Sequence, residues 1–388
     1  MLFLYLKHIL YFMCNKYEMI SNQKFRGLFL GFIVLLSSCS SVQKTTPTSQ
    51  ESEEFLINTI GFYNLENLFD TEDDPTKFDE SSPLMEIAEG ERETIYRAKV
   101  ANMAKVIADL GSEVTGKPPA VIGVCEVENF NVLQDLVNDH SLSGYDYGII
   151  HYNSPDARSI DVALLYRKSI FRPIHSKAHE LVLYSDIDRT KRKYTRDQLY
   201  VKGKLDGEEM HFIVNHWPSR RGGEKRSRPN RVNAAKLTKK IKDSIQTQDP
   251  YAKILIMGDF NDGPYNESIK EVLEAQEFSE NLGIRGLYNP LEKLFKKGIG
   301  TIAWRDTWDL FDMILVSRPL IHTTDYSSYT LYQANIFNPY YLQNPKGRFK
   351  GYPFRSFADG GFTNGYSDHF PVYLYLIKKK PTEPLPSD

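Results

Sequence analysis

The sequence predicts a single α/β domain, because short apolar segments with strand character alternate with segments of helical periodicity and no long Gly-, Pro- or Ser-rich linker separates them. The chain has 388 residues, of which 41% are hydrophobic and 25% charged. These ordinary globular values exclude a disordered chain, a fibre and a polytopic membrane protein. A formal net charge of −2 argues against a protein that holds nucleic acid by bulk positive charge. Three cysteines are too few for a disulfide framework, so the core must form by packing.

Residues 1–39 have the features of an export signal. A short basic region, Lys24-Phe25-Arg26, precedes the apolar residues 27–36, which as a helix would rise about 15 Å, about half the hydrocarbon thickness of a bilayer. Such a segment is too short to span a membrane and is typical of a secretory signal. Met19 stands where such a signal normally begins, which makes it the alternative start of the translated chain.

The segment Leu36-Ser37-Ser38-Cys39 resembles a bacterial lipobox. The resemblance implies cleavage before Cys39 and acylation of its thiol; an ordinary signal peptide with an incidental Cys39 is the alternative. Residues 40–54 are polar and rich in Ser and Thr, which predicts a flexible tether. We therefore expect an exported bacterial lipoprotein, anchored to a membrane through Cys39 on either the periplasmic or the cell-surface side.

From Phe55 onward the pattern predicts one catalytic domain over residues 55–378, followed by a polar tail at 379–388. Apolar, β-branched and aromatic runs predict strands at 55–63, 121–125, 161–166, 210–215, 253–257, 311–316 and 370–376. Apolar residues at helical spacing predict helices over 96–110 and 234–245. No internal repeat of solenoid-like period is present, so one α/β domain is the simplest architecture.

Polar side chains that could perform chemistry follow the ends of these strands. Within Asn64-Leu65-Glu66 and Asp259-Phe260-Asn261 the polar residues are two apart, which on a strand places both side chains on one face. The other candidates are Glu126 after the run from Val121, His216 after the run from Met210, Asp312 beside Phe311, and the pair Asp368-His369 before the last strand. Each of these residues alone is more often a turn residue or a hydrogen-bonded structural residue, so only the set is informative.

The set resembles the active site of the endonuclease/exonuclease/phosphatase superfamily. Its motifs occur in the order Asn-x-Glu, Glu, His, Gly-Asp-Phe-Asn, Asp and Ser-Asp-His, from about Thr59 to Tyr373. The segments 62–70 and 215–220 are similar to a bacterial secreted subgroup. The resemblance implies a four-layer αββα sandwich, with two mixed β-sheets packed face to face, flanked by helices, and the site at the edge where the strand-end loops meet.

The resemblance also implies a metal site. Glu126 is the first candidate ligand, with Asn64 and Glu66 beside it and Asp368 completing the set. Because these are oxygen ligands without Cys or clustered His, they favour a hard cation, Mg²⁺ or Mn²⁺.

The remaining residues would perform the hydrolysis. By the family's pattern, Asp259 orients or deprotonates the attacking water and Asn261 holds the phosphate or the water. His369 donates to the developing negative charge, and Asp312 fixes its tautomer. His216 donates to the leaving oxygen or to the phosphate.

Four arginines are candidates for binding the substrate phosphate: Arg158, Arg196, Arg220 and Arg231. Residues 216–231 contain six basic residues against one acid, Glu224, which is consistent either with a loop that holds a phosphate backbone or with a solvated charged loop. Arg231 opens the second predicted helix and could instead pair locally.

The sequence therefore predicts a metal-dependent phosphoester hydrolase, and as substrate it favours nucleic acid, DNA or RNA, hydrolysed outside the cytoplasm by in-line attack of water. A sphingomyelinase-like or inositol-phosphate phosphatase-like enzyme is the alternative. The inositol phosphatases are disfavoured because Asp262-Gly263-Pro264 follows the Gly-Asp-Phe-Asn motif where they carry an Arg, and because Leu310-Phe311-Asp312 replaces their Cys-Asp-Arg segment.

Two other classes of protein fit the sequence less well. A calcineurin-like phosphoesterase matches Gly-Asp-x-x-Asp at 258–262 but requires an upstream Asp-x-His, which Asp139-His140 does not supply. A binding lipoprotein whose active site has decayed is disfavoured, because every position that matches the family's motifs carries a residue able to perform the chemistry. No protein partner can be inferred from the sequence.

Overall fold

The computed structural model describes residues 54–380 with gaps at 186–187, 281 and 322–324. The chain divides into two units, Met1–Glu51 and Ser52–Asp388, and the fold described below is that of the second unit. The export signal, Cys39 and almost all of the tether lie outside the described residues, as does the end of the polar tail. Within the described part of the chain, no helix combines the length and the apolar character needed to cross a membrane.

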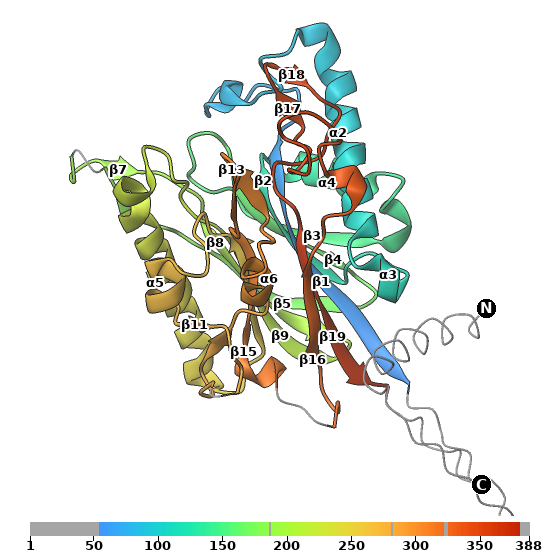
Figure 1. Ribbon diagram of the computed structural model, residues 1–388, viewed down its shortest axis with the longest axis vertical. Helices are drawn as coiled ribbons and strands as arrows, with labels where there is room; N and C mark the ends of the chain where they lie inside the picture. Colours follow the sequence, from blue (N-terminus) through green and yellow to red (C-terminus); the bar gives the residue numbers. More distant parts are fainter. Residues whose placement is uncertain (1–53, 186–187, 281, 322–324, 381–388) are drawn as a thin grey trace, which may run out of the picture. The chain divides into compact units, whose positions relative to one another are not determined.

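Two mixed β-sheets form the centre of the domain (Figure 1). The first has the order β16 (Thr330–Ile336), β19 (Val372–Lys379), β1 (Phe55–Leu68), β2 (Val121–Val127), β4 (Asp161–Arg167) and β3 (Tyr147–His151). The second has the order β11 (Ala275–Gln276), β12 (Leu287–Tyr288), β15 (Asp312–Ser317), β10 (Ile254–Asp259), β9 (Glu208–His216), β8 (Gln198–Leu205) and β5 (Phe171–His179).

Helices cover the outer face of each sheet. On the first sheet lie α2 (Glu89–Asp109), α3 (Ser112–Thr115) and α4 (Phe130–Asn138), and on the second lies α5 (Glu224–Gln248) (Figure 1). The short helix α6 is Glu292–Phe295, and three two-stranded ribbons complete the described structure: β6–β7 (Leu183–Tyr184, Arg192–Lys193), β13–β14 (Ile302–Trp304, Thr307–Asp309) and β17–β18 (Phe357–Ala358, Gly361–Phe362). The predicted four-layer sandwich is confirmed.

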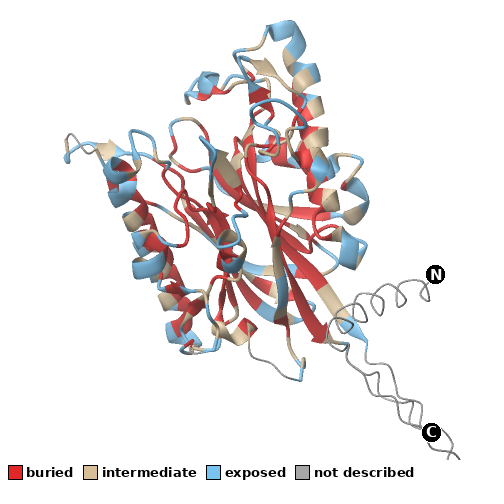
Figure 2. Ribbon diagram, viewed as in Figure 1, coloured by how far each residue is buried: buried red, intermediate tan, exposed pale blue. Residues whose placement is uncertain are grey.

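The core lies between the two sheets, where the central strands, such as β2, β4, β10 and β15, are almost entirely buried (Figure 2). All six residues of β10 are buried because one face packs on the other sheet and the other face packs under α5. Gly123 of β2 lies at a close approach between the sheets, since a Cβ atom there would lie 2.6 Å from Sδ of Met257 in β10. A larger residue would push the sheets apart at their centre.

Every strand and helix predicted from the sequence is present, with longer boundaries in most cases. β1 extends from Phe55 to Leu68, and the predicted helix 96–110 is the C-terminal part of α2. The pattern of residues did not predict β3, β5, β8, β16 or α4. The strand β16 at the edge of the first sheet is buried mainly at its two ends, so its sequence lacks the apolar run that identifies a central strand.

Candidate active site

The polar residues of the second sheet meet because the strand register aligns them. Asp259, the last residue of β10, lies opposite His216 at the end of the parallel neighbour β9. It also lies opposite Asp312 at the start of the antiparallel neighbour β15. Three chemically active side chains therefore share one edge of the sheet.

The first sheet contributes its residues at the same edge. Asn64 of β1 lies opposite Cys125 of the parallel strand β2, which places Glu126 one step further along. His369 precedes β19, whose first residue, Val372, pairs with Phe62. The strand ends of both sheets thus converge, as the resemblance implied.

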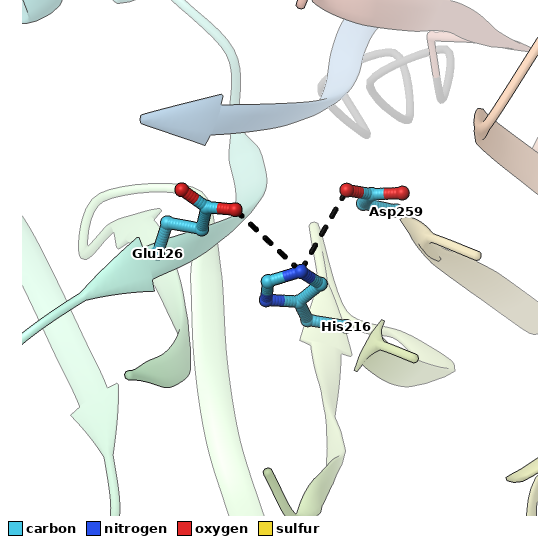
Figure 3. A group of neighbouring side chains, drawn as sticks. All are labelled: Glu126, His216 and Asp259. Carbon is cyan, nitrogen blue, oxygen red and sulfur yellow. Dashed lines mark ion pairs between the residues drawn. The ribbon is translucent and has the colours of Figure 1, made fainter. Parts of the chain in front are cut away.

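Glu126, His216 and Asp259 form the centre of the site (Figure 3). Nε2 of His216 lies 3.6 Å from Oε1 of Glu126 and 3.7 Å from Oδ2 of Asp259. The Asn64 amide joins the same two carboxylates, since its Nδ2 donates to Glu126 at 3.3 Å and to Asp259 at 3.1 Å. Side chains from four strand ends therefore point toward one small volume.

His369 and Asp312 form a second, adjoining group with Asp259. Nδ1 of His369 is 2.7 Å from Oδ2 of Asp312, and its Nε2 is 3.9 Å from Oδ2 of Asp259. Burial acts to lower the pKa of His369, but the charges of Asp312 and Asp259 outweigh it and hold this pKa well above its usual value. Burial, with the charges of Asp312 and Glu126, raises the pKa of Asp259 to about 7 against the opposing effect of His369.

His216 is the neutral histidine of the site. Burial, together with the positive charges of Arg196 and Arg158, lowers its pKa well below the usual value. Its Nδ1 has no hydrogen-bond partner among the described residues. A neutral imidazole carries one N–H, so His216 can donate from Nε2 into the space between the carboxylates.

An unusual backbone conformation sets the direction of several of these side chains. Glu66, Glu126 and Asn261 have φ values of 45°, 58° and 50°, in the left-handed region that non-glycine residues rarely adopt. The same local geometry lets the Asn261 N–H donate to Oδ1 of Asp259 at 2.9 Å. Strained backbone of this kind clusters at functional sites.

Asn261 and Arg196 are linked through one carbonyl group. The Trp217 carbonyl accepts from Nδ2 of Asn261 at 3.1 Å and from a terminal nitrogen of Arg196 at 2.8 Å. Arg196 also pairs with Asp156 at 3.5 Å and is 5% exposed. Arg196 is therefore buried, and through the Trp217 carbonyl it supports the residues at the ends of β9 and β10.

The structure places Glu66 differently from the sequence prediction. Its carboxylate accepts from Nε of Arg355 at 3.0 Å and from the Ser356 N–H at 2.6 Å, so it does not join Glu126 and Asp259. The positive φ of Glu66 interrupts the strand, and the register of β1 and β2 shifts at this point. The expectation that Asn64 and Glu66 face the same way is therefore wrong.

Asp368 belongs with Glu66 rather than with the central group. Arg355 bridges the two carboxylates, since one of its terminal nitrogens lies 3.2 Å from Oδ2 of Asp368. Burial and the Asp368 charge raise the pKa of Glu66 to about 7, and Lys99, whose ammonium donates to the Glu66 carbonyl, opposes this shift. Arg355 and Lys99 were missed by the sequence analysis because only the fold brings them to Glu66.

The remaining arginines differ in their access to a ligand. Arg158 is 42% exposed in its side chain and only loosely paired with Asp156, at 4.0 Å. Arg220 is partly exposed and donates from Nε to the Asn261 carbonyl at 2.9 Å, which places it at the mouth of the site.

Arg231 is not accessible to a substrate. Its side chain is 0% exposed, and its Nε lies 2.7 Å from Oδ1 of the equally buried Asp262. This arrangement supports local pairing, the alternative left open by the sequence, and does not support a role in phosphate binding.

The family assignment follows from comparison of the sequence with known families. The model of the Endonuclease/Exonuclease/phosphatase family matches residues 59–378, which is most of the chain. The chain belongs to this family. Members of the endonuclease/exonuclease/phosphatase family hydrolyse phosphoester bonds, so the chain is a phosphoester hydrolase. A comparison with curated proteins found no match.

Solved structures with a similar fold come from bacteria and animals. An endonuclease/exonuclease/phosphatase family protein of Bacteroides thetaiotaomicron is 17% identical, with a TM-score of 0.49 over 84% of this chain and 97% of that chain. A mannosyl-6-phosphatase of the same organism is 18% identical, with a TM-score of 0.49 over 82% and 99%. D. rerio TDP2, in complex with a single-strand DNA product, is 14% identical, with a TM-score of 0.48 over 82% and 98%.

Enzymes of the endonuclease/exonuclease/phosphatase family depend on a divalent metal, and the described residues fit one. Glu126, His216 and Asp259 each offer a ligand atom, and these atoms all lie within 4.8 Å of one another. The carboxylate oxygens of Glu126 and Asp259 are donors that a hard cation prefers, whereas the Asn64 amide oxygen accepts from the Glu66 N–H at 2.8 Å. A cation among them would also relieve the carboxylate crowding that contributes to the raised pKa of Asp259.

A cavity of about 620 Å³ lies away from this chemistry. Its lining includes Glu208 and Lys253, at the beginnings of β9 and β10, whereas the catalytic residues lie at the ends of the same strands. Both lysines of its lining, Lys253 and Lys378, lie against the Glu208 carboxylate. We therefore assign the chemistry to the edge that carries Glu126, His216 and Asp259.

Proposed function

We propose that the chain is a divalent-metal-dependent phosphodiesterase that hydrolyses nucleic acid outside the cytoplasm. The observation that carries this proposal is the exposed basic segment that directly follows His216. Among residues 219–228, Arg221, Lys225, Arg226 and Arg228 are exposed, and only Arg228 forms a close ion pair, with Glu224 at 3.0 Å. A run of exposed cations beside the site suits a substrate with many phosphates.

An aromatic hairpin beside the site favours nucleic acid over other polyanions. Trp304, at the tip of β13–β14, is 70% exposed, and the Arg305 guanidinium lies 5.5 Å from the centre of its ring. The hairpin is fixed next to the catalytic residues because Trp308 stacks on Phe370, which follows His369, at 6.0 Å. An exposed ring with a neighbouring cation can stack on a nucleobase.

The chain's own residues can carry out in-line hydrolysis. Asp259 accepts the proton of the attacking water, and Asn261 holds Asp259 in position through its backbone N–H. Asp312 keeps His369 protonated, so that Nε2 donates to the negative charge that develops on the phosphate. His216 donates from Nε2 to the phosphate or to the leaving oxygen.

We assign the divalent metal as Mg²⁺ or Mn²⁺, with Glu126 as its first ligand and the Asp259 carboxylate beside it. When bound, it neutralises phosphate charge and polarises the scissile bond. The export signal and lipobox support placing the enzyme on a membrane outside the cytoplasm, through a lipid on Cys39.

A comparison of substrates tests this proposal. We expect the purified protein with Mn²⁺ or Mg²⁺ to cleave single-stranded DNA or RNA oligonucleotides and bis(4-nitrophenyl) phosphate at least tenfold faster than 4-nitrophenyl phosphate or mannose 6-phosphate. The reverse preference, for monoesters, would replace the nuclease proposal with a small-molecule phosphatase that uses the same site. Cleavage of sphingomyelin in preference to nucleic acid would assign the enzyme to the lipid hydrolases.

A further inference from the structure

The loop between β1 and α2 concentrates negative charge outside the catalytic centre. Six of its residues from 70 to 80 are acidic, namely Asp70, Glu72, Asp73, Asp74, Asp79 and Glu80, against one basic residue, Lys77. The Lys77 ammonium donates to the carbonyl groups of Ser154 and Asp156, at 3.2 Å each. Its hydrogen bonds are therefore made to a neighbouring loop and not to the carboxylates.

Two of these acids are committed to local structure. Oδ1 of Asp74 accepts from the backbone N–H and the hydroxyl of Thr76 at 2.9 and 2.6 Å. Asp70 accepts from the Glu72 N–H at 2.8 Å and from Asn129 at 2.9 Å. These contacts fix the loop and leave other carboxylates available for a ligand.

Three carboxylates of the same loop converge instead. Asp73, Asp79 and Glu80 each offer one oxygen, and these oxygens all lie within 4.8 Å of one another. Asp73 and Glu80 are exposed, so the group opens to solvent on one side. Like charges at this spacing repel unless a cation lies between them.

Asp79 is the observation that points to a ligand. The residue is 1% exposed, its Oδ2 accepts from the Asp74 N–H at 2.9 Å, and its Oδ1 has no hydrogen-bond donor among the described residues apart from the contact of the side chain with the Glu128 carboxyl group. A second buried carboxyl group, that of Glu128 with 4% exposure, lies beside it. An unpaired carboxylate oxygen buried next to another acid is costly, which a bound cation would relieve.

We propose that Asp73, Asp79 and Glu80, with Glu128 next to Asp79, hold a second divalent cation of the Ca²⁺ class. The donors are all oxygens, which excludes the softer metals that prefer nitrogen or sulfur. The exposed side of the group leaves room for waters, and Ca²⁺ accepts such mixed and irregular sets of six to eight oxygens.

This site would order one wall of the active site without taking part in the chemical step. The loop is joined to residues 154–158 by the Phe78 N–H, which donates to the Ala157 carbonyl at 2.8 Å, and by the two bonds of Lys77. Asp156 of that segment pairs with Arg196, which in turn holds the Trp217 carbonyl. A cation that fixes the loop therefore also fixes the support of Arg196.

A bound proton, in place of a cation, is the competing explanation for how Asp79 and Glu128 can be buried side by side. Burial, with the charges of Asp70 and Asp79, raises the pKa of Glu128 to about 8, so a proton on Glu128 could take the place of the cation. In that case acidification alone stabilises the protein and Ca²⁺ has no effect.

A calcium titration of the full-length protein separates the two explanations. Glu126→Gln serves as the background, because it weakens the catalytic metal site, and the protein is first treated with a chelator. We expect millimolar Ca²⁺ to raise the Tm by about 5 °C in this background. Adding Asp73→Asn with Glu80→Gln, both exposed positions, should abolish the rise, whereas the matched pair Glu72→Gln with Glu86→Gln should retain it.

Terbium luminescence gives a second measurement that does not depend on stability. We expect Tb³⁺ emission in the Glu126→Gln background, displaced by Ca²⁺, and at least tenfold weaker binding after Asp73→Asn with Glu80→Gln. Equal Ca²⁺ shifts and equal Tb³⁺ binding in the two double variants would overturn the proposal. Stabilisation by acid with no response to Ca²⁺ would also overturn it, in favour of the proton on Glu128.

Discussion

Nδ1 of His369 lies 2.7 Å from Oδ2 of Asp312, and both side chains are more than 90% buried. The bond joins the segment before β19 of the first sheet to the start of β15 in the second sheet. It fixes the imidazole so that Nε2 faces Asp259. In the proposed mechanism Asp312 therefore acts through His369, as a positioning residue.

Replacing Asp312 with Asn should lower kcat by about 10²–10⁴-fold and change KM little, because the charge that keeps His369 protonated is lost. The loss should be smaller at lower pH, where His369 regains its proton. Steady-state kinetics across pH measure both effects. Asp243→Asn, on the outer helix α5, is the matched control, and an Asp312→Asn protein with unchanged kcat would contradict this role.

Glu126→Gln should remove one bound metal ion. The substitution keeps the size of the side chain but weakens the ligand that faces Asn64, His216 and Asp259. Isothermal titration with Mn²⁺ should show the stoichiometry falling by one, while Glu271→Gln, an exposed position on the second sheet's side, leaves it unchanged. Full Mn²⁺ stoichiometry in Glu126→Gln would require a different set of ligands.

Arg231→Met should destabilise the fold. Removing Arg231 takes away the close partner of the buried Asp262 and leaves it the longer contact with Arg220 at 3.4 Å, so we expect a loss of up to about 3–5 kcal/mol in the free energy of unfolding. Urea denaturation measures this loss, with Arg221→Met on the surface as control. A stable Arg231→Met protein with a raised KM would instead support the phosphate-binding role suggested by the sequence.

Asp197→Asn should stabilise the protein at pH 8. Burial, with the charges of Glu180 and Asp161, raises the pKa of Asp197 to about 6 from an unfolded value near 3.8. Because the folded state holds this proton more tightly, protonation stabilises the fold, and that contribution is lost as the pH rises from about 4 through 6. The variant should therefore gain about 1 kcal/mol at pH 8, after allowance for solvent screening of this half-buried group.

The comparison of unfolding free energies at pH 8 and pH 4.5 checks this sign. The advantage of Asp197→Asn over the wild type should shrink on acidification, because the wild-type carboxyl becomes neutral as well. An advantage that grows toward acid pH would contradict the assignment.

Trp304→Ala should weaken the binding of nucleic acid selectively. Stacking of one base is worth about 1–3 kcal/mol, so we expect KM for a single-stranded oligonucleotide to rise about tenfold. Hydrolysis of bis(4-nitrophenyl) phosphate, which has no base to stack at the hairpin tip, should not change. Tyr251→Ala is a control of equal exposure, 70%, at the other end of β10.

Much of the site could be predicted from the sequence, because the end of a strand determines where the residue that follows it lies in the fold. Asn64, Glu126, His216 and Asp259 each follow a recognisable apolar run, and the ends of neighbouring strands lie together once the sheet forms. The family's order of motifs then implied two mixed sheets face to face with the site at one edge, which periodicity alone could not supply.

The predictions that failed depend on backbone conformation and on tertiary contacts, which the pattern of residues along a strand does not encode. Glu66 turned away because its φ of 45° ends the alternation of side chains, which no pattern of residue types encodes. Arg355 reaches Glu66 across 289 positions of sequence, so its role appears only in the folded chain. Arg231 lies in a basic segment that suggested a ligand site, but the packing of α5 buries it against Asp262.

The central claim is that Asp259 and its neighbours catalyse metal-dependent hydrolysis of a phosphodiester backbone. The most direct test is the nicking of supercoiled plasmid DNA by wild type and Asp259→Asn, with Mg²⁺, with Mn²⁺ and with a chelator. The account predicts nicking by the wild type that requires the metal and is reduced at least 10²-fold by the substitution. Nicking that persists in the chelator, or that Asp259→Asn leaves unchanged, would contradict it.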